Sequence, residues 1–390
     1  MRIYLDHNAT TPPLPEVIDA VAAAQRDLFG NASSVHHHGQ LAKAALDRAR
    51  SSVANLIGAN TNEVLLTSGG TESDNLAIRG IAEATEPSSK RHLVTSTIEH
   101  EAVLTTFKAL EKRGWLTTFI PVDTSGVVEP QLLHDILSAR SGDTSLVSIM
   151  HANNEIGTVQ PITALARIAH EHGALFHTDA VQSAGKLQVN VNDLGVDLLS
   201  LSGHKFYGPK GTGALWVRRG IRLVKQTTGG KQERNRRAGT ENVPAVVGLG
   251  VAAMHAAQAI EKDAPRLSEL RDHLERGILS SVKGTQVNGK STDRVSNTTN
   301  ISFNNVEAEA LLIALDLEGI SVSTGSACSS GTLEPSHVLK AIGLSTHRTQ
   351  NSIRFSVGLG NNTEQIDRVV ELIPRTVAKL RSLNRRPVRT

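Results

Sequence analysis

Residues 198–217 read LLSLSGHKFYGPKGTGALWV. An apolar run ends at Ser202, and Lys205 follows it in a turn of small residues and proline before a second apolar run begins. This pattern places a lysine at the end of a buried strand, inside a tight loop. Desolvation there favours the neutral, nucleophilic amine, which suits covalent chemistry with an aldehyde cofactor. From this stretch alone, a surface lysine that happens to follow a strand is an equally good interpretation.

Residues 175–186, LFHTDAVQSAGK, hold the second signal, because a strand-like run ends in Asp179 and Gln182 follows. The carboxyl ends of neighbouring parallel strands meet at one edge of a sheet, so Asp179 and Lys205 are expected side by side. Pyridoxal phosphate needs such a pair, a lysine for its aldehyde and a carboxylate for its ring nitrogen. A helix cap is the commoner role of a lone aspartate. The pairing with Lys205 favours the cofactor interpretation.

A third stretch, residues 64–84, suits a phosphate. The strand-like run VLLTS leads through Gly69, Gly70 and Thr71 into a helical pattern. Glycines before a helix leave backbone N–H groups open to an anion, and the helix dipole adds to the attraction. An ordinary cap or tight turn has the same appearance.

Composition limits the class of protein. The chain has 390 residues, 39% of them hydrophobic, which is enough for a large core and more than one domain. A net charge of +3, from 41 basic and 38 acidic residues, does not indicate a nucleic-acid-coating surface. We expect no signal peptide and no membrane-spanning segment. The single cysteine excludes an internal disulfide, so a reducing, cytoplasmic location is expected.

Short apolar runs alternate with helical periods between residues 64 and 218. This rhythm predicts an α/β protein with a mainly parallel sheet covered by helices. The expected strands are 64–68, 92–98, 116–122, 145–151, 175–178, 198–201 and 213–217.

The rest of the chain predicts a smaller α+β domain. The expected elements are helices 244–261, 265–282, 307–318 and 363–383 and strands 301–303, 320–323 and 353–357. We therefore place a large domain at residues 14–260 and a smaller one at residues 1–13 together with 261–390.

Cys328 lies in STGSACSSGT, among small and polar residues. A cysteine in such a loop is available as a thiolate, whereas most cysteines are buried and inert, and the residues alone leave both interpretations open. The triplet 36–38, HHH, is not expected to bind a metal, because adjacent side chains point in different directions and no further ligand cluster is visible.

Eight motifs give the chain a resemblance to a known family. They are GGTESDN (69–75), IEHEAV (98–103), MHANNEIGTVQP (150–161), FHTDAVQSAGK (176–186), SLSGHKFYGPKG (200–211), QERNRRAGTENV (232–243), STGSACSSGTLEPSHVL (323–339) and SIRFSVG (352–358). In this order they resemble the cysteine desulfurases, pyridoxal-phosphate enzymes of the class V aminotransferase group, and above all their nitrogenase-associated and housekeeping iron–sulfur members. The resemblance extends from residue 4 almost to the end. It implies fold type I of these enzymes, with a seven-stranded, mainly parallel sheet, a smaller α+β domain and a homodimer.

The resemblance also implies how the cofactor is held. Lys205 would bind its aldehyde, Asp179 its ring nitrogen and Gln182 its ring hydroxyl. The phosphate would be held by Gly70, Thr71, Ser202 and His204, with Thr240 supplied by the second subunit.

Three further residues receive roles from the resemblance. His100 would stack on the ring and act as acid and base, although a helix-start histidine is the plain alternative. Asn154 would contact cofactor and substrate, and Arg354 would grip the substrate carboxylate, to which a guanidinium fork is suited. Arg354 lies in an apolar strand pattern and is otherwise hard to place, because an unpaired buried charge is costly.

The implied reaction removes sulfur from L-cysteine and releases L-alanine. Lys205 removes the α-proton, and the Cys328 thiolate attacks the substrate sulfur and leaves as a persulfide. An acceptor protein, such as an iron–sulfur scaffold, then takes the sulfur, and Cys328 would transiently ligate a cluster in such a complex. No resident metal, membrane or nucleic-acid partner is expected.

Other functions remain open. A selenocysteine lyase or a class V aminotransferase would share the fold, although an aminotransferase has no use for Cys328. A non-catalytic docking scaffold is disfavoured by the joint presence of Lys205, Asp179, His100 and Cys328. Arg234, Arg236 and Arg237, near the mouth of the site, would suit an acidic acceptor, with plain solvated surface as the alternative.

Overall fold

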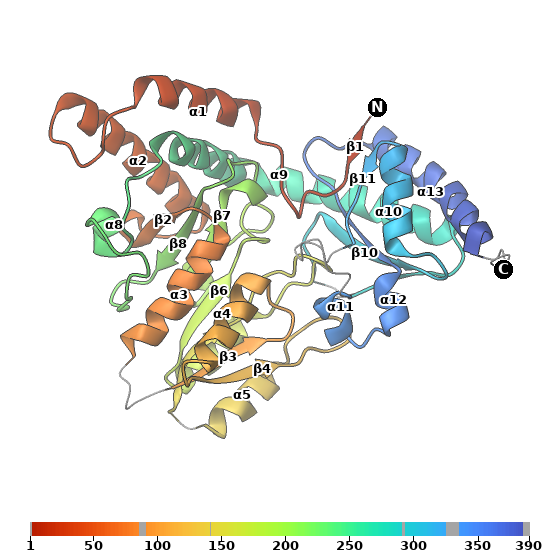
Figure 1. Cartoon of the computed structure of the whole chain (residues 1–390), viewed down its shortest axis with the longest axis horizontal. Helices are drawn as coiled ribbons and strands as arrows, with labels where there is room; N and C mark the ends of the chain where they lie inside the picture. Colours follow the sequence, from red (N-terminus) through yellow and green to blue (C-terminus); the bar gives the residue numbers. More distant parts are fainter. Residues whose placement is uncertain (1, 86–90, 141, 291–292, 325–334, 385–390) are drawn as a thin grey trace.

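The computed structural model describes residues 2–85, 91–140, 142–290, 293–324 and 335–384 (Figure 1). Cys328 lies outside the described residues. The described chain forms a larger part around a seven-stranded sheet and a smaller part that contains two small sheets.

The seven-stranded sheet has the order β2-β8-β7-β6-β5-β3-β4. β8 runs antiparallel to both of its neighbours, and the other adjacent pairs are parallel. The strands are β2 (Val64–Thr67), β3 (His92–Ser96), β4 (Leu116–Ile120), β5 (Thr144–Ser148), β6 (Leu175–Asp179), β7 (Leu198–Ser202) and β8 (Gly213–Val217). Each expected apolar run overlaps one of them, so the predicted mainly parallel α/β sheet is confirmed.

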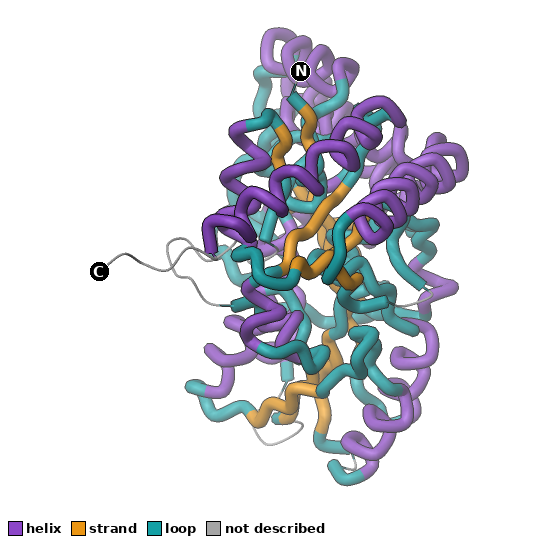
Figure 2. Tube along the Cα trace, turned by 90° about the vertical axis from the view of Figure 1, so that its right-hand side faces the viewer, coloured by secondary structure: helices purple, strands orange, loops and turns teal. Residues whose placement is uncertain are grey.

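Helices cover both faces of this sheet, and Figure 2 shows the strands inside with helices around them. Leu65 and Leu198 pack into one core with α3 and α4, whereas Val64 and Leu199 pack into a second core with α2, α6 and α9. Burial on both faces explains why the strands read as continuous apolar runs. The elements around the sheet are α1 (Pro15–Asp27), α2 (His37–Leu56), α3 (Gly70–Ala84), α4 (Glu101–Glu111), α5 (Pro130–Ser138), α6 (Ile162–Glu171), α7 (Val191–Leu194), α8 (Gln232–Asn235), α9 (Val243–Ser281), η1 (Thr61–Glu63) and η2 (Gly203–Lys205).

The start of the chain belongs to the smaller part. β1 (Ile3–Tyr4) pairs in parallel with β11 (Ile320–Ser321), and Figure 1 shows it, in red, beside the blue C-terminal elements. Ile3 and Leu5 share a core with Phe303 and Phe355. The other elements here are β9 (Thr285–Val287), β10 (Thr298–Phe303), β12 (Ser352–Ser356), α10 (Ala308–Leu317), α11 (His337–Ala341), α12 (Thr346–Gln350) and α13 (Thr363–Asn384). The division into domains at residue 260 stays a prediction.

α9 differs from the expectation of two helices, because it runs unbroken for 39 residues through Pro265. A proline inside a helix removes a hydrogen bond and crowds the preceding turn. Packing of α9 against α1, α2 and α13 outweighs that cost. By length and composition α9 is also apolar enough to cross a membrane, although no such segment was expected from the sequence. Because half of its most apolar window is buried inside the protein, as in a core helix, this is weak support for a membrane span.

Gly250 in α9 allows a close approach to α2. A Cβ atom on Gly250 would lie 2.6 Å from the Cα atom of Ala49. Overpacking costs about 1–3 kcal/mol, and the gain in helix propensity returns at most about 1 kcal/mol. We therefore expect Gly250→Ala to lower the midpoint of thermal unfolding, as followed by circular dichroism. Gly360→Ala is the control, because nothing lies within 4 Å of that Cβ position. Equal midpoints for both variants would contradict the close packing of α2 and α9.

Candidate active site

Lys205 and Asp179 lie at the same edge of the sheet. β6 ends in Asp179 and β7 leads into η2, which ends in Lys205. The two strands are parallel neighbours, with Asp179 opposite Ser200. Lys205 Nζ donates to the backbone oxygens of Asn8, at 2.6 Å, and of Ala9, at 2.8 Å. The structure thus brings the predicted lysine and acid together, next to the N-terminal segment.

Asp179 is buried, and its contacts are compatible both with a helix cap and with a partner for the cofactor ring nitrogen. Its Oδ1 accepts a hydrogen bond of 2.8 Å from the Val181 N–H, which is a cap-like contact. Burial raises the pKa of the Asp179 carboxyl, whereas the Val181 bond and the nearby charges of His100 and Lys205 lower it. Three ionisable groups of the predicted site therefore act on one another.

The start of α3 forms an anion cradle at this edge. Gly69 has φ 154 and ψ −177, which only glycine adopts readily, and no side chain caps the helix. A Cβ atom on Gly70 would lie 2.7 Å from Val181 Cγ2, so only glycine fits there. Ser202 Oγ lies 3.7 Å from the Cβ position of Gly69. The first N–H groups of a helix lack partners within it and attract anions, so Gly70, Thr71 and Ser202 suit a phosphate.

Two histidines of the predicted site are fixed by hydrogen bonds. His100 is the N-cap of α4, and its Nδ1 accepts from the Ala102 N–H at 3.1 Å. The neutral ring of His100 therefore carries its proton on Nε2. His204 Nδ1 lies 3.1 Å from Thr10 Oγ1, and burial, helped by Lys205, lowers the pKa of His204 to about 4. His204 is therefore neutral at neutral pH.

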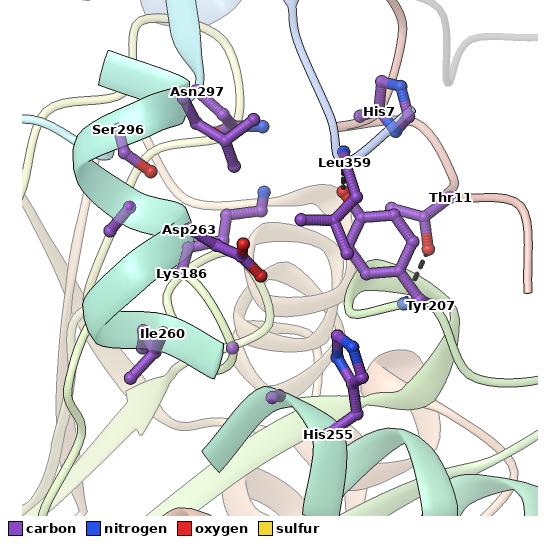
Figure 3. Close-up of a pocket in the computed structure, with 14 residues that line it drawn as sticks. His7, Thr11, Lys186, Tyr207, His255, Ile260, Asp263, Ser296, Asn297 and Leu359 are labelled. Carbon is purple, nitrogen blue, oxygen red and sulfur yellow. Dashed lines mark hydrogen bonds between the residues drawn. The ribbon is translucent and has the colours of Figure 1, made fainter. Parts of the chain in front are cut away.

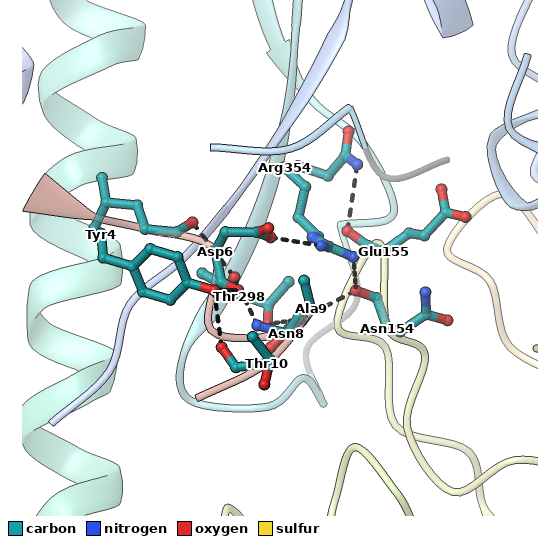
Figure 4. Close-up of polar contacts among 12 residues, drawn as sticks. Tyr4, Asp6, Asn8, Ala9, Thr10, Asn154, Glu155, Thr298 and Arg354 are labelled. Atoms are coloured by element: carbon teal, nitrogen blue, oxygen red, sulfur yellow. Dashed lines mark hydrogen bonds and ion pairs between the residues drawn. The ribbon is translucent and has the colours of Figure 1, made fainter. Parts of the chain in front are cut away.

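Arg354 is buried and has a partner that no local sequence pattern revealed. Its Nη2 donates to Asp6 Oδ1 at 2.7 Å, and its Nη1 donates to the backbone oxygen of Asn154 at 3.1 Å (Figure 4). Asp6 follows β1 and supplies the negative charge that a buried guanidinium needs. Arg354 thus lies next to the backbone of Asn154, and the substrate-binding role of both residues stays a prediction.

Asn8 and Lys186 connect the site, although no role was expected for them from the sequence. The Asn8 backbone oxygen accepts from Gln182 Nε2 at 3.0 Å, in addition to Lys205. The Asn8 side chain donates to the Asn154 backbone oxygen at 3.0 Å. Lys186 Nζ donates to Asn8 Oδ1 at 2.9 Å and to Gln182 Oε1 at 2.7 Å. For Asn8, the sequence signal that could have revealed this role was the polar run DHNATT, which directly follows a strand-like start.

The candidate active site contains several buried carboxyl groups. Burial raises the pKa of Glu99 to about 8, and it raises the pKa values of Asp74, Glu155 and Asp179 as well. Asp179 adds to the rise at Asp74 and at Glu99, since like charges repel one another. Glu99 is therefore largely protonated at neutral pH.

Ser336 and His337, which follow Cys328 in the sequence, contact two buried acids next to the site. Ser336 Oγ donates to Glu155 Oε2 at 2.5 Å, and His337 Nε2 lies 2.9 Å from the backbone oxygen of Glu99. Each of these acids precedes or follows a predicted site residue in the sequence. The described end of the cysteine segment is therefore anchored beside the site.

Two ion pairs, one buried and one half-buried, anchor the arginine-rich loop. Glu233 pairs with Arg50 through bonds of 2.5 and 2.8 Å, and Arg237 pairs with Glu72 at 2.8 Å. The interpretation of Arg237 as plain solvated surface is thus wrong, because Glu72 holds its guanidinium against the start of α3. Thr240 is exposed on this loop and is outside the hydrogen bonds that connect the described site residues of this single chain.

Comparisons with known proteins identify the family of the chain. The family described as aminotransferase class-V matches residues 3–369. The chain belongs to this family. It is 48% identical to cysteine desulfurase IscS of Dictyoglomus turgidum over 383 residues, and this aligned region covers 98% of this chain and 96% of that protein. A NifS-like protein is similar in structure, with a TM-score of 0.91 and 36% identity over 97% of this chain and all of the other. A structure of SspA in complex with cysteine is also similar, with a TM-score of 0.80 and 37% identity over 92% of this chain and 99% of the other.

Class-V aminotransferases use pyridoxal 5′-phosphate, and the residues of this chain fit that cofactor. Lys205 offers an amine for the aldehyde, and the buried Asp179 offers a carboxylate for the ring nitrogen. The uncapped start of α3 offers backbone N–H groups for the phosphate. All three lie at the carboxyl edge of the sheet, where ligands of α/β proteins bind.

Glu99 makes the stability of this class-V aminotransferase fold depend on pH. Its pKa of about 8 exceeds the ordinary value of 4.5, so its contribution to stability is complete below pH 4.5 and is lost as the pH rises through about 8. We expect Glu99→Gln, which stays neutral, to flatten the decline of the unfolding temperature across this range, measured by calorimetry. Glu101→Gln, at an exposed neighbouring position, should keep the decline of the unmodified protein. A decline that persists in Glu99→Gln would show that Glu99 is not its source.

Proposed function

We propose that the chain is a cysteine desulfurase that removes sulfur from L-cysteine, gives L-alanine and carries the sulfur as a persulfide on Cys328. The observation that supports this most is the position of Lys205 beside Asp179 and His100 at the carboxyl edge of the sheet. Transamination would need the same pair, but it would have no use for the cysteine in STGSACSSGT. SspA, a relative solved in complex with cysteine, supports cysteine as the substrate.

In this proposal the sheet edge holds pyridoxal phosphate. Lys205 holds the aldehyde, Asp179 the ring nitrogen and Gln182 the ring hydroxyl. The phosphate is held by Gly70, Thr71, Ser202 and His204, together with Thr240 from a second copy of the chain. When bound, the cofactor supplies a ring that accepts electron density from the substrate's α-carbon.

The chain's own residues bind the substrate and move its protons. Arg354 and Asn154 hold the substrate carboxylate, and Asp6 keeps the guanidinium oriented through the bond of 2.7 Å. Lys205, once its amine is free, takes the α-proton as a base. His100 is suited to donate a proton, because its Nδ1 is occupied by the Ala102 N–H and Nε2 carries the hydrogen.

The sulfur leaves the substrate by attack of the Cys328 thiolate. A sulfur–sulfur bond forms while the carbon–sulfur bond breaks, and the electron pair stays with the carbon fragment, which takes up protons and departs as alanine. Cys328 keeps the outer sulfur as a persulfide. A sulfur-acceptor or iron–sulfur scaffold protein in the cytoplasm then takes it, and neither a membrane nor a nucleic acid takes part directly.

Replacement of Cys328 separates sulfur removal from cofactor binding. We expect Cys328→Ala to keep the visible absorption of bound cofactor and its response to L-cysteine, but to release alanine at least about 10³-fold more slowly, as for other lost nucleophiles. Lys205→Ala should lose both the visible band and turnover. Absorption spectra and an alanine assay measure these outcomes. Normal alanine release by Cys328→Ala would refute the role of Cys328, and far faster turnover of selenocysteine would favour a lyase.

Mixing of variants tests the proposed homodimer. In a mixed dimer of Lys205→Ala and Thr240→Ala chains, both defects fall in one site and the other site is intact, because a two-fold interface is self-complementary. We expect mixing to restore about a quarter of the unmodified activity, since half of randomly formed dimers are mixed and each has one intact site. Activity is assayed at low cofactor concentration after subunit exchange. An active monomer in sedimentation would contradict a shared site.

A further inference from the structure

Lys186 is a buried lysine that the proposed reaction does not use. Its side chain is only 7% exposed, and it lies beyond the end of β6, four residues after Gln182. Burial lowers the pKa of its amine well below the ordinary value, and the charges of Lys205 and Arg354 add to this effect. A buried amine costs free energy unless its hydrogen bonds are made, so its partners show what it does.

The partners of Lys186 fix the direction of the Gln182 carboxamide. Gln182 Oε1 accepts from Lys186 Nζ at 2.7 Å, and Gln182 Nε2 donates to the Asn8 backbone oxygen at 3.0 Å. The two ends of a carboxamide have nearly the same shape, so its direction is set by its partners. The backbone oxygen of Asn8 can only accept, so the nitrogen of Gln182 lies toward Asn8 and its oxygen lies toward Lys186. One N–H of Gln182 serves Asn8, and the second N–H remains for another acceptor.

Lys186 also holds Asn8 from the same atom. Asn8 Oδ1 accepts from Lys186 Nζ at 2.9 Å and from Asn297 Nδ2 at 3.0 Å. The Asn8 carboxamide therefore presents its nitrogen to the Asn154 backbone oxygen, at 3.0 Å. The backbone oxygen of the same residue accepts from Lys205. A single amine thus orients two carboxamides next to the reactive lysine.

Lys186 also lines a small cavity (Figure 3). His7 and Ser296 line this cavity, and His7 Nδ1 and Ser296 Oγ have no hydrogen-bond partner among the described residues. Lys186 is therefore the cavity residue that is bonded to Gln182, whereas Ser296 shares the cavity without that contact. This difference supplies a matched control.

We infer that Lys186 is a positioning residue that locks the Gln182 carboxamide with its nitrogen available to the ring hydroxyl of the cofactor. The inference rests on the proposed role of Gln182 in the site. A donor at the ring oxygen lowers that oxygen's affinity for a proton. Loss of the lock therefore raises the pH at which the visible band of the bound cofactor titrates.

The test is a spectroscopic pH titration of the cofactor-loaded enzyme. Lys186→Met keeps the length of the side chain and removes its donors. We expect the midpoint of the visible band to rise by about one pH unit, because a hydrogen bond to a charged oxygen is equivalent to about one pKa unit or more. Gln182→Leu should raise the midpoint similarly, and Lys186→Met should add nothing in the Gln182→Leu background. Ser296→Ala should leave the midpoint unchanged.

Several outcomes would overturn the inference. An unchanged midpoint in Lys186→Met, additive shifts in the double variant, or an equal shift in Ser296→Ala would each do so. Unchanged midpoints in both Lys186→Met and Gln182→Leu would also contradict the proposed contact between Gln182 and the ring hydroxyl. None of these results would contradict the proposed activity, because alanine release and the loss of the visible band in Lys205→Ala test that activity separately. If Lys186→Met fails to hold cofactor, a crystal structure of the unmodified holoenzyme decides. Gln182 must then lie within about 3.2 Å of both Lys186 Nζ and the ring oxygen.

Discussion

The contact between the N-terminal segment and the carboxyl edge of the sheet is the constraint on which the site depends. Asn8 and Ala9 supply the oxygens that hold Lys205. Thr11 then donates to the His204 backbone oxygen and accepts from the Tyr207 N–H at 2.7 Å, so the two chain segments are joined on both sides of the lysine. The same segment begins with Ile3, buried in the core of the smaller part. One short stretch therefore connects Lys205 to the hydrophobic core of the smaller part.

The electrostatics of the site follow from this enclosure. Burial raises the pKa values of the carboxyl groups there and lowers that of Lys186, so the site favours neutral forms of both kinds of group. Arg354, buried among these groups, is paired with Asp6. Perturbed groups of this kind gather where protons are moved.

Local sequence patterns predicted the sheet and the position of Lys205 and Asp179, because strand ends in a parallel sheet share one edge and the apolar runs are short and distinct. The roles of His100, Arg354 and Thr240 came from the resemblance to a family, and they remain predictions. Asn8 and Lys186 were missed because their importance lies in contacts with residues far away in sequence, which no local period reveals. Pro265 misled for the opposite reason. A proline normally ends or kinks a helix, and the packing of α9 against its neighbours outweighs that local effect.

The pairing of β1 with β11 has a consequence for how the protein is made. Ile3 is synthesised long before its partner Ile320. At about 5–20 residues per second, the interval between them is roughly 15–60 s. During that time the strands that carry Asp179 and Lys205 have already been synthesised, while the segment that will cover the lysine has no strand to join. Until β11 has been synthesised, the nascent chain thus lacks the strand partner that holds this segment in place.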